Sequence, residues 1–196
     1  ITCHIGNGGS ITAIKDGHSV DTSMGMTPLE GLVMGTRAGD IDTGAITYLM
    51  EREHFDTAAI SNILNKKSGL LGISGVSSDM RDVRAAIAEG NQRAKLALDM
   101  FIYRVKKYIG SYVAVLGGVD VIVFTGGIGE NVDVVRQAIC ADMECFGVKL
   151  NESLNADVHG DEMIISTPDS ATKVVVIPTD EEYMIASDTL DIVSEL

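Results

Sequence analysis

Two short glycine-rich segments are the parts of this sequence best suited to chemistry. Residues 4–10 read HIGNGGS, and residues 125–131 read TGGIGEN. Each follows a run rich in apolar and β-branched residues, and the second leads into a helical pattern. Backbone N–H groups that gather in such a turn bind phosphate or ribose oxygens. Both segments therefore predict contact with a nucleotide, although neither the P-loop pattern nor the dinucleotide-binding glycine pattern occurs.

Each glycine segment also has an ordinary structural interpretation. Gly6, Gly8 and Gly9 would allow positive φ angles, but Asn-Gly is also the commonest pair in a type I′ hairpin turn. In the second segment a tight strand-to-helix connection accounts for one glycine, but not for three glycines followed by an asparagine. That segment also comes directly after a strand, where open α/β sheets bind ligands.

Arg37 is the candidate for stabilising charge during a reaction. It lies in a glycine-flanked loop, residues 35–39, whose sequence is GTRAG. A guanidinium there could reach a phosphoryl oxygen and stabilise the charge that develops on it. The alternative is a surface ion pair with Asp40 or Asp42.

The remaining candidates are an imidazole and charged groups near helix starts. Asp79 and Arg81 lie in the first turn of a predicted helix, where an aspartate ordinarily serves as a cap. Glu181 also lies in a capped helix start, but its carboxylate follows a strand and could reach a magnesium ion directly or through water. His4 stands in an alternating strand, where it either contacts phosphate or is a buried, hydrogen-bonded histidine.

Composition limits the classes of partner. The 196 residues carry a net charge of −13, so nucleic acid and anionic membranes are poor partners, and a phosphate ligand needs local binding groups. The longest apolar runs are far shorter than the roughly 20 residues of a membrane span. Three irregularly spaced cysteines favour a reducing compartment, by default the cytoplasm. The chain opens in a strand without cap or leader, which suggests a piece of a longer protein.

The elements that must position these residues begin with strands. We expect an antiparallel meander over residues 1–21, because Asp16-Gly17 is a hairpin signal. Helical patterns and capping residues then predict helices over residues 43–52, 56–65, 77–89, 92–116 and 132–143.

The second half of the chain alternates strands and helices. Buried strands are predicted over 119–125 and 173–177, with a hairpin-like stretch around 148–166. Thr179 as N-cap and Glu182 at the third helical position form a capping box for a closing helix. This order predicts one α/β domain with a mixed sheet.

Six segments taken together closely resemble the acetate kinases. They occur in order along essentially the whole chain, with family-like spacing, at residues 4–10, 22–32, 34–42, 65–75, 78–82 and 124–131. The resemblance implies an α/β ATPase domain of the actin-like, Hsp70-like and sugar-kinase-like (ribonuclease H-like) fold. It also implies that residues 1–196 form the carboxyl-terminal, nucleotide-binding domain of an enzyme whose amino-terminal half is absent.

The resemblance assigns roles to individual residues. Arg37 matches the arginine that stabilises the transferring phosphoryl group, and Glu181 matches a glutamate associated with Mg²⁺ or Mn²⁺. The remaining matches bind ATP or ADP, through a phosphate loop at His4, Ile5, Gly6, Asn7 and Gly8 and through adenosine-side segments at Asp79, Met80, Arg81, Gly127, Ile128, Gly129, Glu130 and Asn131.

The implied reaction is the reversible transfer of a phosphoryl group from ATP to acetate, which gives acetyl phosphate and ADP. Propionate or butyrate kinase activity, or a non-catalytic nucleotide-binding module of the same fold, are the alternatives. The family's subunits pair through this half, so a homodimer is expected, with the helix over 92–116 in the core or at the interface. The missing half supplies further groups near the transferred phosphate, so we expect this chain alone to bind ATP weakly, if at all, and not to phosphorylate acetate.

Overall fold

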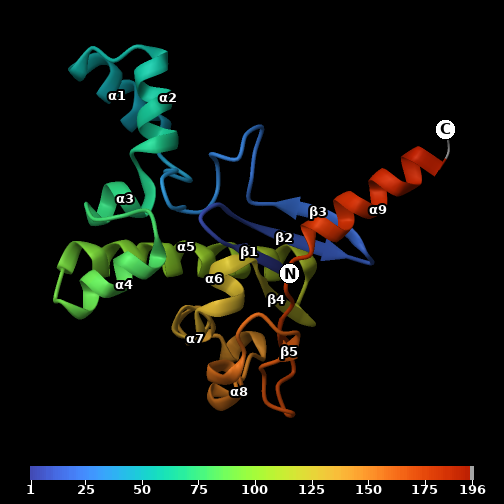
Figure 1. Ribbon diagram of the computed structural model, residues 1–196. Coiled ribbons are helices and arrows are strands. Elements are labelled where there is room, and N and C mark those ends of the chain that lie inside the picture. The colour runs from blue at the N-terminus through green and yellow to red at the C-terminus, as the bar shows by residue number, and fades with distance from the viewer. Residues whose placement is uncertain (195–196) are drawn as a thin grey trace.

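A mixed six-stranded sheet forms the centre of the computed structural model, which describes residues 1–194 (Figure 1). The strands are β1 (Thr2–Ile5), β2 (Gly9–Lys15), β3 (His18–Thr22), β4 (Val121–Thr125), β5 (Met163–Ile164) and β6 (Lys173–Val176). Their order across the sheet is β3-β2-β1-β4-β6-β5. The pairs β1–β4 and β4–β6 are parallel and the others are antiparallel. The predicted mixed sheet is thus confirmed.

The amino-terminal meander forms as its turn signal predicts. Asp16 and Gly17, which join β2 to β3, have φ angles of 52° and 79°. A two-residue hairpin turn with the twist of its strands needs this left-handed pair of conformations. Lys15 and His18 consequently face each other across the hairpin.

The helices agree with the predicted ones best where a polar side chain caps them. The side chains of Asp42, Asp56 and Asn91 accept hydrogen bonds from amides of the helices that follow. Within residues 1–194, none of the helices has the length and apolar character needed to cross a membrane. The helices are α1 (Thr43–Glu53), α2 (Thr57–Lys66), α3 (Gly69–Ser74), α4 (Met80–Ala88), α5 (Gln92–Leu116), α6 (Gly126–Asn131), α7 (Asp133–Cys140), α8 (Glu152–Asp157) and α9 (Glu181–Ser194), with a 3-10 turn at Glu144–Phe146.

Three local predictions differ from the structure in part or in full. The helix expected over 132–143 is shorter, because the chain already turns helical at Gly126 and is interrupted at Val132. The stretch expected to be hairpin-like, 148–166, is paired antiparallel only at its ends, through a single bridge between Leu150 and Ser166, and α8 lies between them. Its strand β5 pairs with β6 instead. The predicted capping box before α9 does not form, because Asp180 rather than Thr179 accepts the hydrogen bond from the Tyr183 amide.

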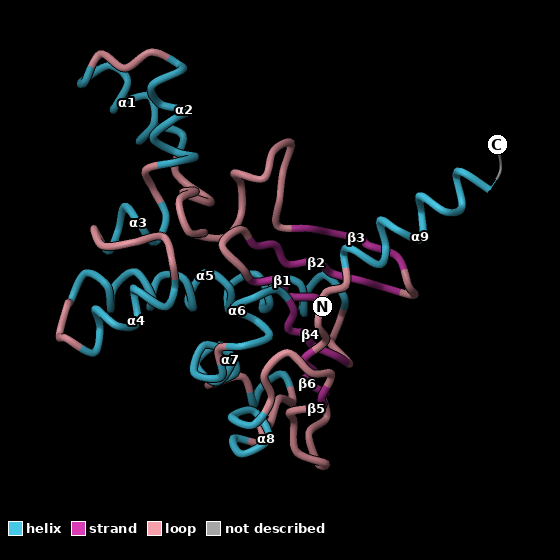
Figure 2. The backbone as a smooth tube through the Cα atoms, viewed as in Figure 1, coloured by secondary structure: helices cyan, strands magenta, loops and turns pink. Residues whose placement is uncertain are grey.

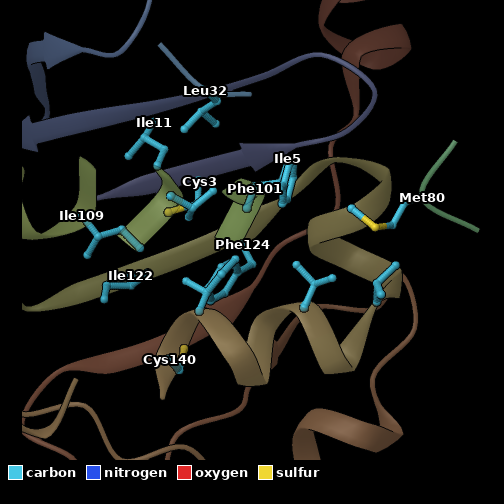
Figure 3. Close-up of a cluster of buried hydrophobic side chains, with 14 of the residues drawn as sticks. Cys3, Ile5, Ile11, Leu32, Met80, Phe101, Ile109, Ile122, Phe124 and Cys140 are labelled. Atoms are coloured by element: carbon cyan, nitrogen blue, oxygen red, sulfur yellow. The ribbon is translucent and has the colours of Figure 1, made fainter. Parts of the chain in front are cut away.

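The core lies between one face of the sheet and the helices α5 and α7. Alternate strand residues point into it and are fully buried, among them Cys3, Ile122 and Phe124 (Figure 3). The long helix α5 meets them with Phe101, Val105 and Ile109, all 2% exposed or less. One face of α5 therefore belongs to the core, and segments that pack against α5 are held by a rigid helix.

Two parts of the chain extend away from this core. Helices α1 and α2 form an arm on one side, and α9 extends from the opposite side (Figures 1 and 2). Neither α1 nor α9 contains a buried residue. The large apolar side chains of α9 are all more than half exposed, namely Tyr183, Met184, Ile185, Leu190, Ile192 and Val193. A helix with such a surface normally packs against another element.

Candidate functional site

The two glycine-rich segments lie side by side, at the carboxyl ends of the adjacent parallel strands β1 and β4. In the register of these strands His4 lies opposite Thr125. A Cβ atom on Gly6 would lie 3.9 Å from the backbone nitrogen of Gly127, and one on Gly126 would lie 2.9 Å from the Ile5 carbonyl oxygen. A single ligand can therefore contact both segments.

The conformation of these segments differs from the predicted turns. Gly6, Gly8 and Gly9 do not adopt positive φ angles, whereas Gly126 does, at 77°. At Gly8 and Gly9 the lack of a side chain provides space, because a Cβ would lie 3.3 Å from Arg37 Nη1 and 3.1 Å from the His4 carbonyl oxygen. The second segment is not a turn but the short helix α6.

A cavity of about 690 Å³ opens between the two segments and the start of α4. This volume lies in the range of small-molecule sites. Eight of the predicted nucleotide-binding residues line it, namely Gly6, Asn7, Asp79, Met80, Arg81, Gly127, Ile128 and Asn131. Three further lining residues were not predicted from the sequence, namely Ser78, Arg84 and Val132. Arg84 follows Arg81 by three positions on a helix, so both lie on one face, and this spacing could have predicted that Arg84 lies near the site.

A second cavity, of about 480 Å³, adjoins the first at Gly127. His4 and the start of α9 line it, so the structure brings together the imidazole and the Glu181 carboxylate. Asp180 and Glu182 lie beside them. The start of α9 therefore forms an acidic wall of this cavity, and Gly126 and Gly127 contribute main chain to its lining.

Among the residues that the structure describes, five predicted site residues lie outside the linings of these two cavities, namely Arg37 and four of the nucleotide-binding residues. Ile5 and Gly129 are buried behind the walls, and Gly8 faces Arg37. The Glu130 carboxylate accepts hydrogen bonds from the Gly126 amide at 2.8 Å and the Thr179 amide at 3.0 Å. It thereby joins α6 to the segment that leads into α9, a structural role.

Arg37 lies beside the first glycine segment and not in an aspartate ion pair. Its loop is attached to that segment because the Gly35 amide donates to the Asn7 carbonyl oxygen at 2.8 Å. Asp40 pairs instead with Arg104, and the Asp42 side chain caps α1. Over residues 1–194 Arg37 forms no salt bridge, so its charge is available to a ligand.

Asp79 and Arg81 form an ion pair at the rim of the larger cavity. The Arg81 Nη2 atom lies 2.6 Å from Asp79 Oδ2, and the Arg81 amide donates to Asp79 Oδ1 at 2.8 Å. Asp79 is therefore the N-cap of α4, the structural role that its position predicted, and it also lines the cavity. The hydrogen bonds from Arg81 lower the pKa of the Asp79 carboxyl to about 2.

We expect the Asp79 carboxyl to titrate with a midpoint of about 2. Because this pKa lies below the ordinary value of about 3.9, the ionised group stabilises the fold above that value, and the contribution is lost as pH falls through the folded-state pKa. The measurement is NMR titration of the labelled side-chain carboxyl carbon. Arg81→Gln should raise the midpoint, while Arg84→Gln should leave it unchanged. A midpoint near 4 in the unaltered protein would contradict the assignment.

The sequence matches one family of known proteins. The profile of the acetokinase family matches residues 1–187. The acetate kinase of Bacteroides thetaiotaomicron is 66% identical over 195 residues, and that of Porphyromonas gingivalis strain W83 is 58% identical over 192 residues. These alignments cover 100% and 98% of this chain but only 49% and 48% of the relatives. The chain thus spans about half the length of the curated relatives that it matches.

Solved structures give the same result for the fold. The crystal structure of Porphyromonas gingivalis acetate kinase matches with a TM-score of 0.95 at 57% identity, over 98% of this chain and 48% of that one. A propionate kinase from Francisella tularensis matches with a TM-score of 0.88 at 45% identity, over 94% and 47%. The fold is therefore the predicted α/β fold of the actin-like ATPases.

Proposed function

Because the chain belongs to the acetokinase family, we propose that it forms the nucleotide-binding half of an acetate kinase. The reaction is the reversible transfer of the terminal phosphoryl group of ATP to acetate, which yields acetyl phosphate and ADP. One observation carries the proposal: the two glycine segments adjoin at the ends of β1 and β4, with the Arg37 guanidinium beside the first.

The larger cavity suits the adenosine part of the nucleotide. Its walls offer the apolar side chains of Met80, Ile128 and Val132, against which a base can pack, and the main chain of both glycine segments. Arg81 and Arg84 place cationic groups at the rim. Apolar walls with a few convergent polar groups are typical of cofactor and nucleotide sites.

Phosphate binding then depends on local groups, because the protein as a whole is strongly acidic. Gly127 lines both cavities, Asn7 lines the larger one and His4 lines the smaller one, so main-chain amides of the two glycine segments would supply these groups. The Gly6 amide is not among them, because it donates to the Gly8 carbonyl oxygen at 2.9 Å. Arg37 can stabilise the charge that spreads over the transferring phosphoryl oxygens. Positioning and charge neutralisation, rather than covalent chemistry, supply most of the catalysis in such transfers.

Mg²⁺ or Mn²⁺ is the expected companion of the nucleotide, and Glu181 is the residue that we propose would hold it. Mg²⁺ usually binds through one or two carboxylates together with substrate phosphates, rather than in a cage of protein ligands. The residues fit this mode, because Glu181 is exposed and lines the smaller cavity. When bound, the metal neutralises phosphate charge.

We further propose that the chain is the carboxyl-terminal half of the enzyme, because its six motifs resemble that half of the acetate kinases. The apolar side chains on α9 would then be covered by the remaining, amino-terminal half of a protein about twice as long. The coding sequence tests this directly. An open reading frame of about 200 codons upstream of Ile1 is expected, and an in-frame stop codon just upstream would overturn the assignment.

The activity itself is tested with the full-length protein and the 196-residue chain side by side. With Mg-ATP and acetate, the full-length protein should form acetyl phosphate, trapped as its hydroxamate, and the chain alone should form none above background. Without the amino-terminal half the acceptor site and part of the phosphate site are missing. Turnover by the chain alone, or none by the full-length protein with any C2 to C4 acid, would overturn the proposal.

Propionate is the second candidate acceptor, since a propionate kinase is among the similar solved structures. Kinetic constants for C2 to C4 acids on the full-length enzyme decide the order. A non-catalytic nucleotide-binding module would bind ATP without turnover of any acid. Arg37, which forms no salt bridge within residues 1–194, favours the kinase.

A second copy of this chain is the partner that we propose, in a cytoplasmic homodimer. Along α5 the side chains of Leu96, Met100 and Tyr103 share one face of the helix and are 40% to 64% exposed. Such a face supports an interface, although the opposite side of α5 belongs to the core. Sedimentation equilibrium of the full-length protein should give the mass of a dimer, and a monomer mass would refute the pairing.

A further inference from the structure

The loop that carries Arg37 is closed at its base by one carboxylate, that of Asp40. The Gly31 amide donates to Asp40 Oδ1 at 2.9 Å, and the Asp40 amide donates in return to the Gly31 carbonyl oxygen at 3.0 Å. Gly31 and Gly39 both adopt positive φ angles, and a side chain at Gly39 would meet the Leu32 carbonyl. The loop over residues 31–40 is therefore a tight, closed unit with Arg37 near its tip.

The same carboxylate joins this loop to the core helix. Asp40 Oδ2 accepts hydrogen bonds from Arg104 Nη1 at 2.6 Å and from the Tyr108 hydroxyl at 2.8 Å. Arg104 also donates to the Asp40 carbonyl oxygen at 3.3 Å. Arg104 and Tyr108 lie one turn apart on α5, whose opposite face is buried in the core. Arg104 thus donates to both the carboxylate and the main-chain carbonyl of Asp40, and the charge-assisted bond fixes geometry as well as contributing energy.

The other end of the loop meets the glycine segment of β1. Gly35 is bonded to the Asn7 carbonyl, and a Cβ on Gly8 would lie only 3.3 Å from the Arg37 guanidinium. The loop thus spans from α5 to the phosphate side of the proposed nucleotide site. Only Ala38 and Gly39 separate Asp40 from Arg37.

We propose that Asp40, held by Arg104 and Tyr108, is a positioning residue that fixes Arg37 for phosphoryl transfer. This inference rests on the proposed function, in which Arg37 contacts the transferring group. Loss of the contacts between Asp40 and α5 would leave the residues that line the nucleotide cavity in place but let the Arg37 guanidinium move. A misplacement of about 1 Å can lower a rate by about 100-fold.

Asp40→Asn in the full-length enzyme is the central test, since the amide keeps the shape and the Gly31 contact but loses the charge. We expect kcat to fall by about 10- to 100-fold with little change in the KM for ATP, the signature of an interaction used in the transition state. Tyr108→Phe removes a single hydrogen bond, so kcat should fall by roughly 2- to 10-fold. Asp99→Asn, which breaks the exposed ion pair with Lys95 on the same helix, is the matched control and should leave kcat unchanged.

A double-mutant cycle separates positioning from general loss of structure. In an Arg37→Ala background, Asp40→Asn should have little further effect on kcat, because the group that it positions is gone. Fully additive effects, or a normal kcat in Asp40→Asn and Tyr108→Phe, would overturn the positioning role. If Arg37→Ala itself leaves kcat unchanged, the proposed function of Arg37 fails instead, so the two failures are distinguishable.

Discussion

Replacing Arg37 with alanine is expected to lower the kcat of the full-length enzyme by about 1,000-fold or more, the value of an arginine that stabilises a transferring phosphoryl group. Its guanidinium lies beside Gly8, forms no salt bridge within residues 1–194 and belongs to a loop bonded to the first glycine segment. The KM for ATP should change little, because the contact strengthens only as charge develops. Steady-state kinetics with ATP and acetate measure both constants.

Two further variants sharpen this prediction. Arg37→Lys keeps a positive charge but loses the planar, two-pronged donor, so its kcat should lie between those of the unaltered enzyme and Arg37→Ala. Arg52→Ala removes an arginine whose side chain is 64% exposed on α1, and it should leave kcat unchanged. A normal kcat in Arg37→Ala would remove the catalytic part of the proposal and favour a non-catalytic nucleotide-binding protein.

The largest effect on stability is expected at Arg136, a fully buried arginine on α7. Its guanidinium donates to the carbonyl oxygens of Gly129 and Glu130 at 3.0 and 2.8 Å, and to Asn155 Oδ1 at 2.7 Å. It also donates to the carbonyl oxygens of Asn155 and Val158. Arg136→Met leaves these acceptors without partners, so the free energy of unfolding should fall by about 3–5 kcal/mol.

Urea unfolding of the full-length protein, followed by circular dichroism, measures this change. Arg136→Lys should recover only part of the loss, because one ammonium cannot reach acceptors that surround a planar group. Arg52→Met, at an exposed position, should change the free energy of unfolding by no more than about 0.5 kcal/mol. An Arg136→Met protein within 1 kcal/mol of the unaltered one would show that the buried network carries little net energy.

Local signals predicted much of the fold because they depend on neighbouring residues alone. The Asp16-Gly17 turn and the helix α5 form where the pattern places them. In contrast, the capping box before α9 fails because the Thr179 amide and hydroxyl both donate to Glu130, 49 positions away. No local pattern contains that contact.

In the candidate site too, features set by neighbouring residues were predicted and contacts between distant residues were not. The residue types in the two glycine segments indicated a phosphate-binding site, and the parallel pairing of β1 and β4 brings the segments together. The partner of Asp40 could not be predicted, because Arg104 lies 64 positions further along the chain, and the nearby Arg37 was the obvious alternative. Charged residues close in sequence are poor guides to ion pairs when a loop closes tightly.

The spacing between the two glycine segments is a property of the main chain itself. At Gly126 the backbone presses directly on Ile5, and its φ angle of 77° is one that residues with a side chain rarely adopt. Exchange of the side chains that line the cavities can therefore alter the cavity walls without altering the distance between the two glycine segments. Alanine at Gly126, by contrast, would push β1 and the start of α6 apart and would change the dimensions of the site that we propose for phosphate.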